Sequence, residues 1–441
     1  MRCKVSQLAL DLEIETADRE PSRYLDTTRY GFFSVLHSPR ASAKKQNSYP
    51  LNRLAWVIEH IDPTRDCWIS QAEFIRPNRR VVNLARIGLC FVDLDTYRTD
   101  LEWMTPEGLC FALLDYCHSE GIPQPSIVIF SGRGLQVKWL YDKTIPRQAL
   151  PRWNACQRVL VEKLSRFGSD PAAKDASRVL RLVNTVNTKS GEICRVIHAS
   201  DHRYDFEYLA ESLLPVRRDE IRLPKQRMRA VTGGWVGNLK PLQSNGLAWD
   251  RLEDLRKLVL MRGGIKEGER MLHLHWQLNF LLLSGATNAN LMYHEARSLA
   301  REMDPYWSYQ KGELSTLYQK AKSYNAGEKV EFSGRTYPAL YTPKNDTLIN
   351  LFRIIDDEQE QLKTIITPAM ALDRRRERDR KRDEERRRTA GAVTRDEYIS
   401  RTKKIGLREQ VLQLQEKGFS QRKIAKEIGI SQQRVSTVLK G

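Results

Sequence analysis

The sequence predicts an α+β domain that is followed by helical domains. Between residues 51 and 209, short β-rich runs alternate with segments of helical spacing, and two of the runs flank a glycine turn. Residues 246–366 have helical spacing, and residues 407–439 form a separate compact helical pattern. A mixture of hairpin-like and helix-linked strands is typical of α+β proteins.

The elements follow in order along the chain. Residues 1–50 are polar, and the stretch 38–48 is predicted to be a loop. Strands are expected at 86–95, 125–130, 135–140 and 192–198, and helices between and after them at 106–119, 150–167, 252–261, 270–283, 288–303, 313–323 and 347–366. The basic stretch 216–245 contains glycine and proline and is predicted to be a linker.

The charge of the chain points to a polyanionic partner. The 441 residues include 73 Lys and Arg against 55 Asp and Glu, a formal net charge of +18. Residues 374–441 hold 21 Lys and Arg against 10 Asp and Glu, so most of the excess lies there. Nucleic acid is the expected partner; an anionic membrane surface would also attract this charge, but no feature of the sequence supports it.

Membrane insertion and secretion are not expected. No apolar run reaches the ~18 residues of a membrane-spanning helix, and the first ten residues lack the apolar centre of a signal peptide. The seven cysteines are scattered and never form C-x-x-C, which excludes a zinc ribbon. We therefore expect free thiols and a cytoplasmic protein.

Two acids mark the end of the strand expected at 86–95. Asp93 and Asp95 are two residues apart, so on a strand they point to the same face. Two carboxylates so placed repel each other unless solvent or a cation compensates them. Mg²⁺ and Mn²⁺ take oxygen ligands of this kind beside substrate phosphates. The plainer interpretation is a solvated pair at a strand end.

Two further segments suit an anion. Ser131-Gly-Arg-Gly134 is a turn whose glycines let backbone N–H groups approach an anion, and Arg133 adds charge. Downstream, two acids precede a group of polar and basic residues that suits phosphate oxygens: Asp170 and Asp175, then Arg178, Arg181, Asn187 and Lys189. Taken alone, an ordinary hairpin turn and a polar loop would explain both segments.

Together these segments resemble the archaeo-eukaryotic primase superfamily, which includes primase-polymerases. The first motif of that family, an apolar strand ending in D-x-D, is matched by Asp93 and Asp95. Its second motif is a Ser-Gly turn followed by a His and an aromatic residue on the next strand. Ser131 begins the turn and Trp139 supplies the aromatic residue, but Gln136 stands at the His position.

The third motif is a lone acid before a basic stretch, and it is also matched. Asp170 fits the acid, with Asp175 as a second candidate, and the basic stretch is matched by Arg178, Arg181, Asn187, Lys189 and Gly191. Val183-Asn184 replaces the usual Pro-Gly. The resemblance covers roughly residues 86–200.

The resemblance implies template-directed nucleotidyl transfer. It implies that Asp93, Asp95 and Asp170 are the catalytic residues and hold two Mg²⁺ or Mn²⁺ ions. It implies a nucleoside triphosphate bound by Ser131, Arg133, Gln136, Arg178, Arg181, Asn187 and Lys189. The implied partners are a single-stranded DNA template, with a helicase or other replication proteins beside it.

The helical middle suggests two further possibilities. Helical accessory domains follow the catalytic domain in many primases of mobile elements, where they can contact the template or the initiating nucleotide. A bundle that only stabilises the first domain fits equally well. His273-Leu-His275 matches the metal motif of rolling-circle nickases, which lies on a strand. Here the apolar period is helical, so the two side chains diverge by ~200° and do not share an ion.

The C-terminal residues form two patterns. Residues 374–388 hold ten Arg and Lys with five acids, which predicts a solvated helix or a flexible linker. Residues 407–439 are similar to a helix-turn-helix, with Ser420 and Ser431 as caps. Its third helix would present residues to the major groove of double-stranded DNA: Gln432, Gln433, Arg434, Ser436 and Thr437. A small protein-contact module is the alternative.

These expectations divide the chain into five parts: a primase-like catalytic domain at 1–215, a linker at 216–245, a helical accessory domain at 246–366, a charged linker at 367–400 and a helix-turn-helix at 401–441. The leading hypothesis is a DNA primase, or primase-polymerase, that serves replication of a plasmid or other mobile element. The competing hypothesis is a non-catalytic replication initiator or transcription regulator with a degenerate primase-like domain. The replacement of His by Gln136 keeps that alternative open.

Overall fold

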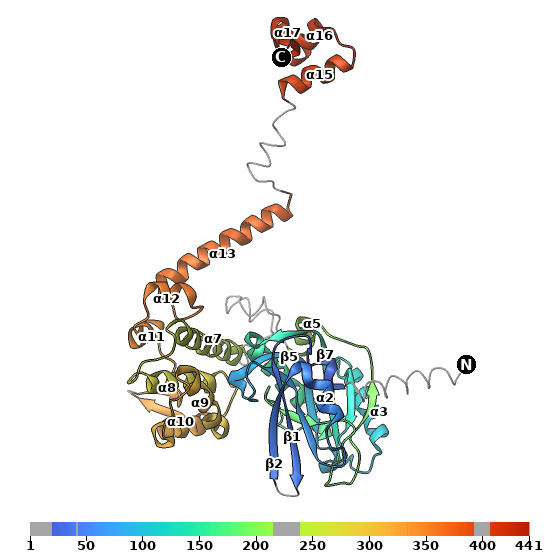
Figure 1. Ribbon diagram of the computed structural model, residues 1–441, viewed down its shortest axis with the longest axis vertical. Coiled ribbons are helices and arrows are strands. Elements are labelled where there is room, and N and C mark those ends of the chain that lie inside the picture. The colour runs from blue at the N-terminus through green and yellow to red at the C-terminus, as the bar shows by residue number, and fades with distance from the viewer. Residues whose placement is uncertain (1–19, 41–42, 215–238, 333, 392–405, 441) are drawn as a thin grey trace, which may run out of the picture. The chain divides into compact units, whose positions relative to one another are not determined.

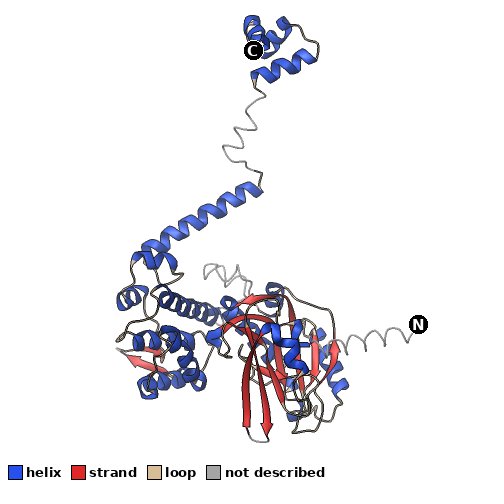
Figure 2. Ribbon diagram, viewed as in Figure 1, coloured by secondary structure: helices blue, strands red, loops and turns tan. Residues whose placement is uncertain are grey.

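The computed structural model describes residues 20–40, 43–214, 239–332, 334–391 and 406–440 (Figure 1). The chain divides into two compact units, Met1–Ile366 and Thr367–Gly441. Strands and helices mix in the first unit, and the described part of the second is helical (Figure 2). The expected combination of sheet and helix is confirmed.

A nine-stranded antiparallel sheet is the centre of the first unit. Its order is β8-β3-β1-β4-β5-β7-β6-β9, and β2 pairs with β1. The strands are β1 Phe32–Arg40, β2 Ala43–Pro50, β3 Cys67–Ser70, β4 Ala72–Phe74, β5 Leu84–Leu94, β6 Ile127–Phe130, β7 Leu135–Pro146, β8 Val179–Arg181 and β9 Arg195–Ala199. The four strands predicted from the sequence correspond to β5, β6, β7 and β9.

The prediction of a loop at 38–48 was wrong. Most of this stretch belongs to the hairpin of β1 and β2, which pair from Phe32 opposite Pro50 to Arg40 opposite Ala43. β2 is an edge strand, and its Lys44, Lys45 and Gln46 are exposed. Lysines are common on edge strands because they discourage pairing with other chains. The polar composition that suggested a loop is therefore that of an exposed edge strand.

Short helices surround the sheet. They are η1 Glu20–Arg23, η2 Leu51–Arg53, α2 Leu54–Glu59, η3 Val81–Asn83, η4 Thr96–Arg98, α3 Pro106–Ser119, η5 Arg147–Ala149, α4 Leu150–Lys163, η6 Ser165–Phe167 and α5 Phe206–Leu213. The helix predicted at 106–119 has those bounds, and its start is fixed by Thr105, whose hydroxyl accepts the Gly108 N–H at 3.2 Å. The helix predicted at 150–167 is divided between α4 and η6.

Helix α4 completes the hydrogen bonding of β5. β4 pairs with β5 only from Leu84 to Ile87, so the outer half of β5 has no strand on that side. There the Trp153 indole donates to the Leu89 carbonyl at 2.9 Å, and the Gln157 amide both accepts from and donates to Phe91 at 3.0 Å. Backbone groups buried in this way need such partners. The outer half of β5 is thus held by side chains and, nearer its end, by a loop.

The rest of the first unit is mainly helical. Its elements are α7 Leu239–Met261, α8 Arg270–Leu283, α9 Ala289–Met303, η9 Lys311–Leu314, α10 Ser315–Asn325, α11 Asn345–Phe352 and α12 Asp356–Gln361, with a hairpin of β10 Lys329–Phe332 and β11 Arg335–Pro338. The described fold therefore corrects the expectation of an all-α domain by adding a hairpin.

Two sequence predictions in this region need further correction. The helix expected at 347–366 is two short helices, because Arg353 has φ +50° and a left-handed residue ends the helical path. The predicted linker 216–245 lies mostly outside the described residues, but α7 already begins at Leu239.

Buried polar contacts join the helices to the sheet. The Glu295 carboxylate on α9 accepts the N–H groups of Val81 and Val82 at 3.2 and 3.1 Å, and burial raises its pKa to about 7. The guanidinium of Arg147 pairs with Glu253 of α7 at 2.7 Å. The first contact fixes the segment that enters β5 against α9, and the second joins η5 to α7.

The described residues of the second unit form α13 Pro368–Thr389 and three short helices, α15 Leu407–Glu416, α16 Gln421–Ile428 and α17 Gln432–Lys440. The charged stretch 374–388 was predicted to be a solvated helix or a flexible linker, and it is a helix. It carries i,i+4 ion pairs such as Lys381–Glu377 at 2.8 Å. The three short helices share a core of Val411, Ile424, Ala425 and Val435. Among the helices of the described chain, none is long and apolar enough to cross a bilayer.

Candidate active site

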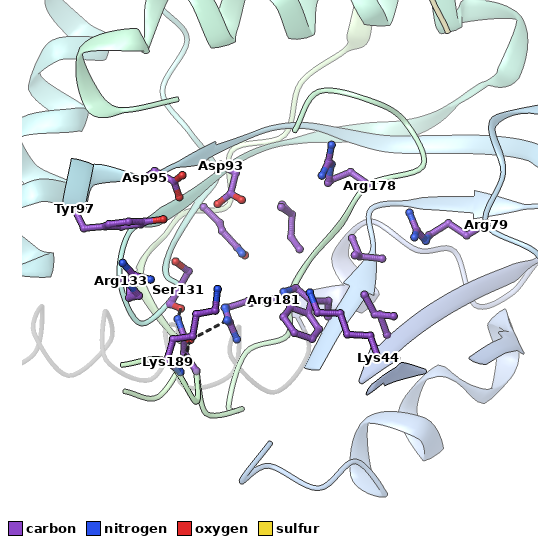
Figure 3. Close-up of a pocket in the computed structure, with 16 residues that line it drawn as sticks. Lys44, Arg79, Asp93, Asp95, Tyr97, Ser131, Arg133, Arg178, Arg181 and Lys189 are labelled. Carbon is purple, nitrogen blue, oxygen red and sulfur yellow. Dashed lines mark hydrogen bonds between the residues drawn. The ribbon is translucent and has the colours of Figure 1, made fainter. Parts of the chain in front are cut away.

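Asp93 and Asp95 lie where β5 ends, against a cavity of about 410 Å³ (Figure 3). Both line this cavity, as expected for residues two apart on a strand. Asp93 lies opposite Gln136 of β7 in the sheet register, and Gln136 lines the same cavity. We call it the β5 cavity below.

Asp170 reaches Asp93 through the unpaired edge of β5. The Asp170 N–H donates to the Asp93 carbonyl at 2.9 Å, and the Asp95 N–H donates to the Gly168 carbonyl at 2.8 Å. The Asp170 carboxylate accepts the N–H of Ala172 at 2.8 Å and does not line the β5 cavity. Asp175 instead accepts from Ser177 and pairs with Arg178 at 2.9 Å. Of the two candidate acids, Asp170 is the neighbour of Asp93.

The carboxylates form an electrostatically unfavourable group. Burial, Asp95 and Asp170 together raise the pKa of Asp93 to about 7. Asp95 pairs with Arg98 at 3.1 Å, while no hydrogen bond or ion pair to the Asp93 carboxylate is found among the described residues. Hard oxygen donors that repel one another suit a divalent cation. Nevertheless, no three His, Cys, Asp or Glu side chains of the described chain are gathered closely enough to form a ligand cluster.

The turn at 131–134 packs tightly against the end of β5. The Ser131 hydroxyl donates to the Gly134 carbonyl at 3.0 Å and accepts the Gly134 N–H at 3.3 Å, so it closes the turn. A Cβ on Gly134 would lie 2.0 Å from the Leu94 carbonyl oxygen, which only glycine avoids. The Arg133 guanidinium lies 3.8 Å from the centre of the Tyr97 ring, just beyond the two acids.

Gln136 is buried with its side-chain oxygen unpaired. The residue is 2 % exposed, and no described group donates a hydrogen bond to its Oε1. An unpaired buried amide costs free energy unless a ligand or water pairs with it. Gln136 is thus inside the β5 cavity, and its side-chain oxygen is unsatisfied there.

Arg181 and Asn187 connect the third sequence segment to the turn. Arg181 pairs with Asp66 at 2.6 Å and donates to the Asn187 side-chain oxygen at 2.8 Å. The Asn187 amide donates in turn to the Ser131 carbonyl at 2.9 Å. These bonds orient the two segments toward each other, although Ser131 and Asn187 are 56 residues apart in sequence.

Several lining residues were missed by the sequence reasoning. Lys44 and Arg79 add two cations, and Trp68 lies beneath both Lys44 and Arg181, at 4.6 and 4.9 Å from its ring centre. Lys44 was assigned to a loop, so nothing linked it to a sheet face. Arg79 belongs to a run of basic residues near β5, but only the fold shows that it enters the cavity.

Three of the cations lie across the β5 cavity from the acids. Figure 3 shows Asp93 and Asp95 on one side, with Lys44, Arg181 and Lys189 opposite them. Six cations and two acids line it: Lys44, Arg79, Arg133, Arg178, Arg181 and Lys189 against Asp93 and Asp95. This arrangement can hold a metal ion at one side and a polyphosphate at the other.

The remaining predicted residues lie elsewhere. Gln432, Gln433, Arg434 and Thr437 of α17 are exposed, and Ser436 is half-buried. Ser431 accepts the Arg434 N–H at 3.3 Å, whereas Ser420 occupies the cap position of α16 without a side-chain cap bond. His273 is buried in α8 against Phe352, and burial lowers its pKa to about 4. Both histidines lie on a helix, as expected, so they are not arranged as a nickase site.

The chain is similar to a replication protein and to primase structures. No family model matches it. A protein of Clostridium perfringens named "Replication protein" is 27 % identical over 305 residues, which are 68 % of each chain.

Three solved structures are also similar. The archaeo-eukaryotic primase domain of the cyanophage S-2L primase-polymerase is 17 % identical, with 46 % of this chain and 98 % of that one covered and a TM-score of 0.35. Primase RepB′ is 14 % identical over 70 % of this chain and 99 % of that one, and its catalytic domain with initiator DNA is 15 % identical over 45 % and 93 %; the TM-score is 0.29 in both cases. Identities this low do not establish an activity, which must be inferred from the residues of the site.

Proposed function

We propose that this protein is a DNA primase that makes primers on single-stranded DNA by metal-dependent nucleotidyl transfer. The observation that carries the proposal is the β5 cavity, where two acids face a set of cations. Such a cavity matches a nucleoside triphosphate with its divalent metal, because the metal needs carboxylates and the phosphates need Arg and Lys. The similarity to a protein named for replication supports the same assignment.

Asp93 and Asp95 would hold Mg²⁺ or Mn²⁺, with Asp170 as a third carboxylate. The metal, when bound, lowers the pKa of the attacking 3′-hydroxyl and offsets charge on the transferred phosphate. Asp93 must be ionised to contribute, and its pKa of about 7 means that metal and proton compete for it near neutral pH. The three carboxylates would thus supply the negative charge that holds the metal beside the substrate oxygens.

The cations opposite would hold the triphosphate. Arg181 is fixed by Asp66 and Asn187, so its guanidinium is oriented before the nucleotide arrives. Lys189 is exposed and would follow the phosphates, and Arg133, against the Tyr97 ring beside the acids, would add a further charge. Gln136, with its unpaired oxygen, would pair with a donor on the nucleotide or with an ordered water.

The first prediction concerns the acids. Asp93→Ala with Asp95→Ala should lower primer synthesis by about 10³-fold or more, because the transferred charge is no longer stabilised. The measurement is incorporation of labelled nucleotides on single-stranded DNA with Mg²⁺ or Mn²⁺. Asp100→Ala with Asp115→Ala, which removes two exposed acids outside the β5 cavity, is the matched control and should leave synthesis unchanged. Full activity of the first variant would refute the assignment.

We further propose that α15, α16 and α17 are a helix-turn-helix that directs the protein to double-stranded DNA of a plasmid or other mobile element. The support is the exposed series on α17 over a closed core below it. Gln and Arg can pair bidentately with adenine and guanine edges in the major groove. A helicase or other replication proteins would then be recruited to the same DNA in the cytoplasm.

The second prediction concerns that helix. Gln433→Ala with Arg434→Ala should lower affinity for the preferred duplex by about 1–3 kcal/mol per lost base contact, without changing primer synthesis. The preferred site is found by selection from random duplexes, and affinity is then measured by gel retardation. Arg408→Ala with Gln413→Ala on α15 is the control, since both residues are exposed on another helix. Unchanged preference in the first variant would contradict the proposal.

The second candidate function is a non-catalytic initiator with a degenerate primase-like domain. The acids of the β5 cavity disfavour it. Repulsion and burial make ionised Asp93 costly in the absence of a cation. A domain that only bound DNA would have no use for that group.

A further inference from the structure

A fully buried ion pair lies on the same face of the sheet as the β5 cavity. The Lys138 ammonium of β7 donates to the Glu20 carboxylate of η1 at 2.6 Å, and neither side chain is exposed to solvent. Lys138 comes two residues after Gln136, which lines the cavity, so the two side chains share one face of β7. Neither member of the pair lines the cavity itself, and the proposed catalysis gives the pair no role.

Stability alone does not account for this pair. Each buried charge loses its hydration, and the attraction between two charges offsets that loss only when hydrogen bonds satisfy the remaining donors and acceptors. Here the Glu20 Oε2 has no partner among the described residues, and the Lys138 ammonium donates only to Glu20. The Tyr24 ring, 4.9 Å from the Lys138 nitrogen, adds a weaker contact. Apolar side chains of similar volume would fill the same space without this cost.

The unpaired oxygen of Gln136 has one neighbour that can donate to it. In the sheet register, Gln136 lies between Asp93 of β5 and Ile129 of β6. Its neighbours on the same face of β7 are Gly134 and Lys138. Ile129 and Gly134 have no polar side chain, and an ionised carboxylate only accepts hydrogen bonds. Lys138 is therefore the donor among these four neighbours.

The Gln136 amide has the orientation that such a donor favours. Its Oε1 is buried without a partner, whereas its Nε2 is not one of the buried groups that lack a partner. Because the residue lines the β5 cavity, the N–H₂ end of the amide faces the cavity. An amide turned in this way donates hydrogen bonds, which suits phosphate oxygens, whereas the reversed amide would present an acceptor to them.

A buried thiol shows that the ion pair is close to the cavity. Burial raises the pKa of Cys194 to about 12. The same pKa also responds to four charged groups, two from the cavity and two from the pair: Arg181, Asp93, Lys138 and Glu20. The pair and the polar lining of the cavity therefore lie around one side chain.

We propose that Lys138, held by Glu20, is a positioning residue that fixes the Gln136 amide through one buried water, so that the amide donates to a phosphate of the nucleotide. This water would have three polar partners, which is the usual number: the Lys138 ammonium, the Gln136 Oε1 and the Glu20 Oε2. Both unpaired oxygens would thereby be satisfied. The inference rests on the proposed function, since it takes the ligand of the β5 cavity to be a nucleoside triphosphate.

The experiment measures nucleotide binding to the full chain by isothermal titration calorimetry. The probe is the α,β-methylene analogue of ATP or dATP with Mg²⁺, because nucleotidyl transfer cannot cleave its bridging carbon. Lys138→Met alone would leave the Glu20 charge buried and unpaired, so Glu20→Met with Lys138→Met replaces the whole pair. We expect this pair variant to unfold at the same urea concentration as the wild type or a higher one. It should bind the analogue roughly 10-fold more weakly, the loss for one unsatisfied buried oxygen.

A second background tests whether the pair acts through the amide. Gln136→Met removes the amide and should itself weaken binding roughly 10-fold or more, the loss of a hydrogen bond to a charged group. Adding Glu20→Met with Lys138→Met to this variant should change affinity by less than about twofold, because no amide remains to be fixed. Equal losses in the two backgrounds, or unchanged affinity of the pair variant, would overturn the proposal.

Two control variants complete the test. Glu20→Gln with Lys138→Gln keeps a donor at position 138 without the charges, and it should bind the analogue more tightly than the pair variant. Equal affinity of these two would contradict the role of Lys138 as a donor. Arg256→Met with Glu302→Met removes another largely buried ion pair, outside the β5 cavity, and should alter affinity by less than about twofold.

The two proposals fail separately. Analogue binding that depends on the background as expected, without any primer synthesis by the wild type, would refute only the catalytic proposal. Primer synthesis by the wild type, together with a pair variant that binds the analogue as tightly as the wild type, would refute only the role of Lys138.

Discussion

The β5 cavity and the three-helix core of the second unit are built in opposite ways. The cavity draws its lining from Leu36 to Lys189, through segments that meet only in the folded sheet. The three-helix core uses residues 411–439, and each helix contributes its own apolar face. The cavity holds unpaired polar groups and close backbone contacts, whereas the core is apolar. Sites that act on ligands retain such unfavourable groups, and a small scaffold cannot tolerate them.

The largest expected effect concerns the close packing of the turn at 131–134 against the end of β5, which has no counterpart at Gly418 of the second unit. Gly134→Ala would place a Cβ 2.0 Å from the Leu94 carbonyl oxygen, so the end of β5 must move. We expect a loss of at least about 3 kcal/mol in the free energy of unfolding of the first unit, measured by urea denaturation.

Gly418→Ala between α15 and α16 is the matched substitution in the second unit. Its Cβ meets open space, and the cost comes from the left-handed φ of +78° alone, about 1–2 kcal/mol. Equal losses at the two positions would contradict the comparison.

The next effect tests whether the second unit stays folded when one buried apolar side chain of its core is shortened. Ile424 is one of four buried core residues, against which six partly buried hydrophobic residues pack, and Ile424→Ala should lower the free energy of unfolding by about 2–5 kcal/mol. A core of this size gives a free energy of unfolding of only about 3–5 kcal/mol. Because the substitution removes most of that stability, α15–α17 should unfold.

Calorimetry of the full chain should then lose the transition of that unit, and specific duplex binding should disappear. Primer synthesis and the transition of the first unit should remain, with Leu412→Ala, at an exposed position of α15, as the control. Persistence of duplex binding in Ile424→Ala would argue that the helices have other support.

The smallest effect concerns the charge of the cavity. The pKa of Asp93 in the folded chain is about 7, above its ordinary value of 3.8, so the folded state binds the proton more tightly than the unfolded state. Stability from this group is therefore complete below about pH 4 and is lost as pH rises toward 7. Asp93→Asn should stabilise the first unit by roughly 1–3 kcal/mol at pH 8, and by less than half of that at pH 5.

Denaturation at the two pH values, without metal, measures this effect. The second unit contains no buried Asp or Glu among its described residues, so its transition should not respond to the substitution. Mg²⁺ should stabilise the wild type more than Asp93→Asn, because the metal compensates the ionised carboxylate. Equal stability of the two proteins at pH 8 would show that Asp93 is not electrostatically strained.

Sequence reasoning succeeded where the signal is local. The helix at 106–119 and the three helices of the second unit follow from apolar spacing, and α17 also from the capping residue Ser431. It placed Asp93 and Asp95 on one face because the period of a strand is two. It failed at β2, where an exposed edge has a loop-like composition, and at Arg353, whose left-handed backbone leaves no sign in apolar spacing.

What the sequence by itself determined is a set of local elements, their order, and the chemical character of three polar segments. Only the tertiary structure decided which residues meet. Asp170 rather than Asp175 adjoins Asp93, because the short β4 leaves an edge of β5 open for residues 168–170. Lys44 and Arg79 join the cavity from segments that lie far in sequence from Asp93 or from Lys189. Such contacts depend on sheet order and register, and neither property is encoded in any single stretch of the chain.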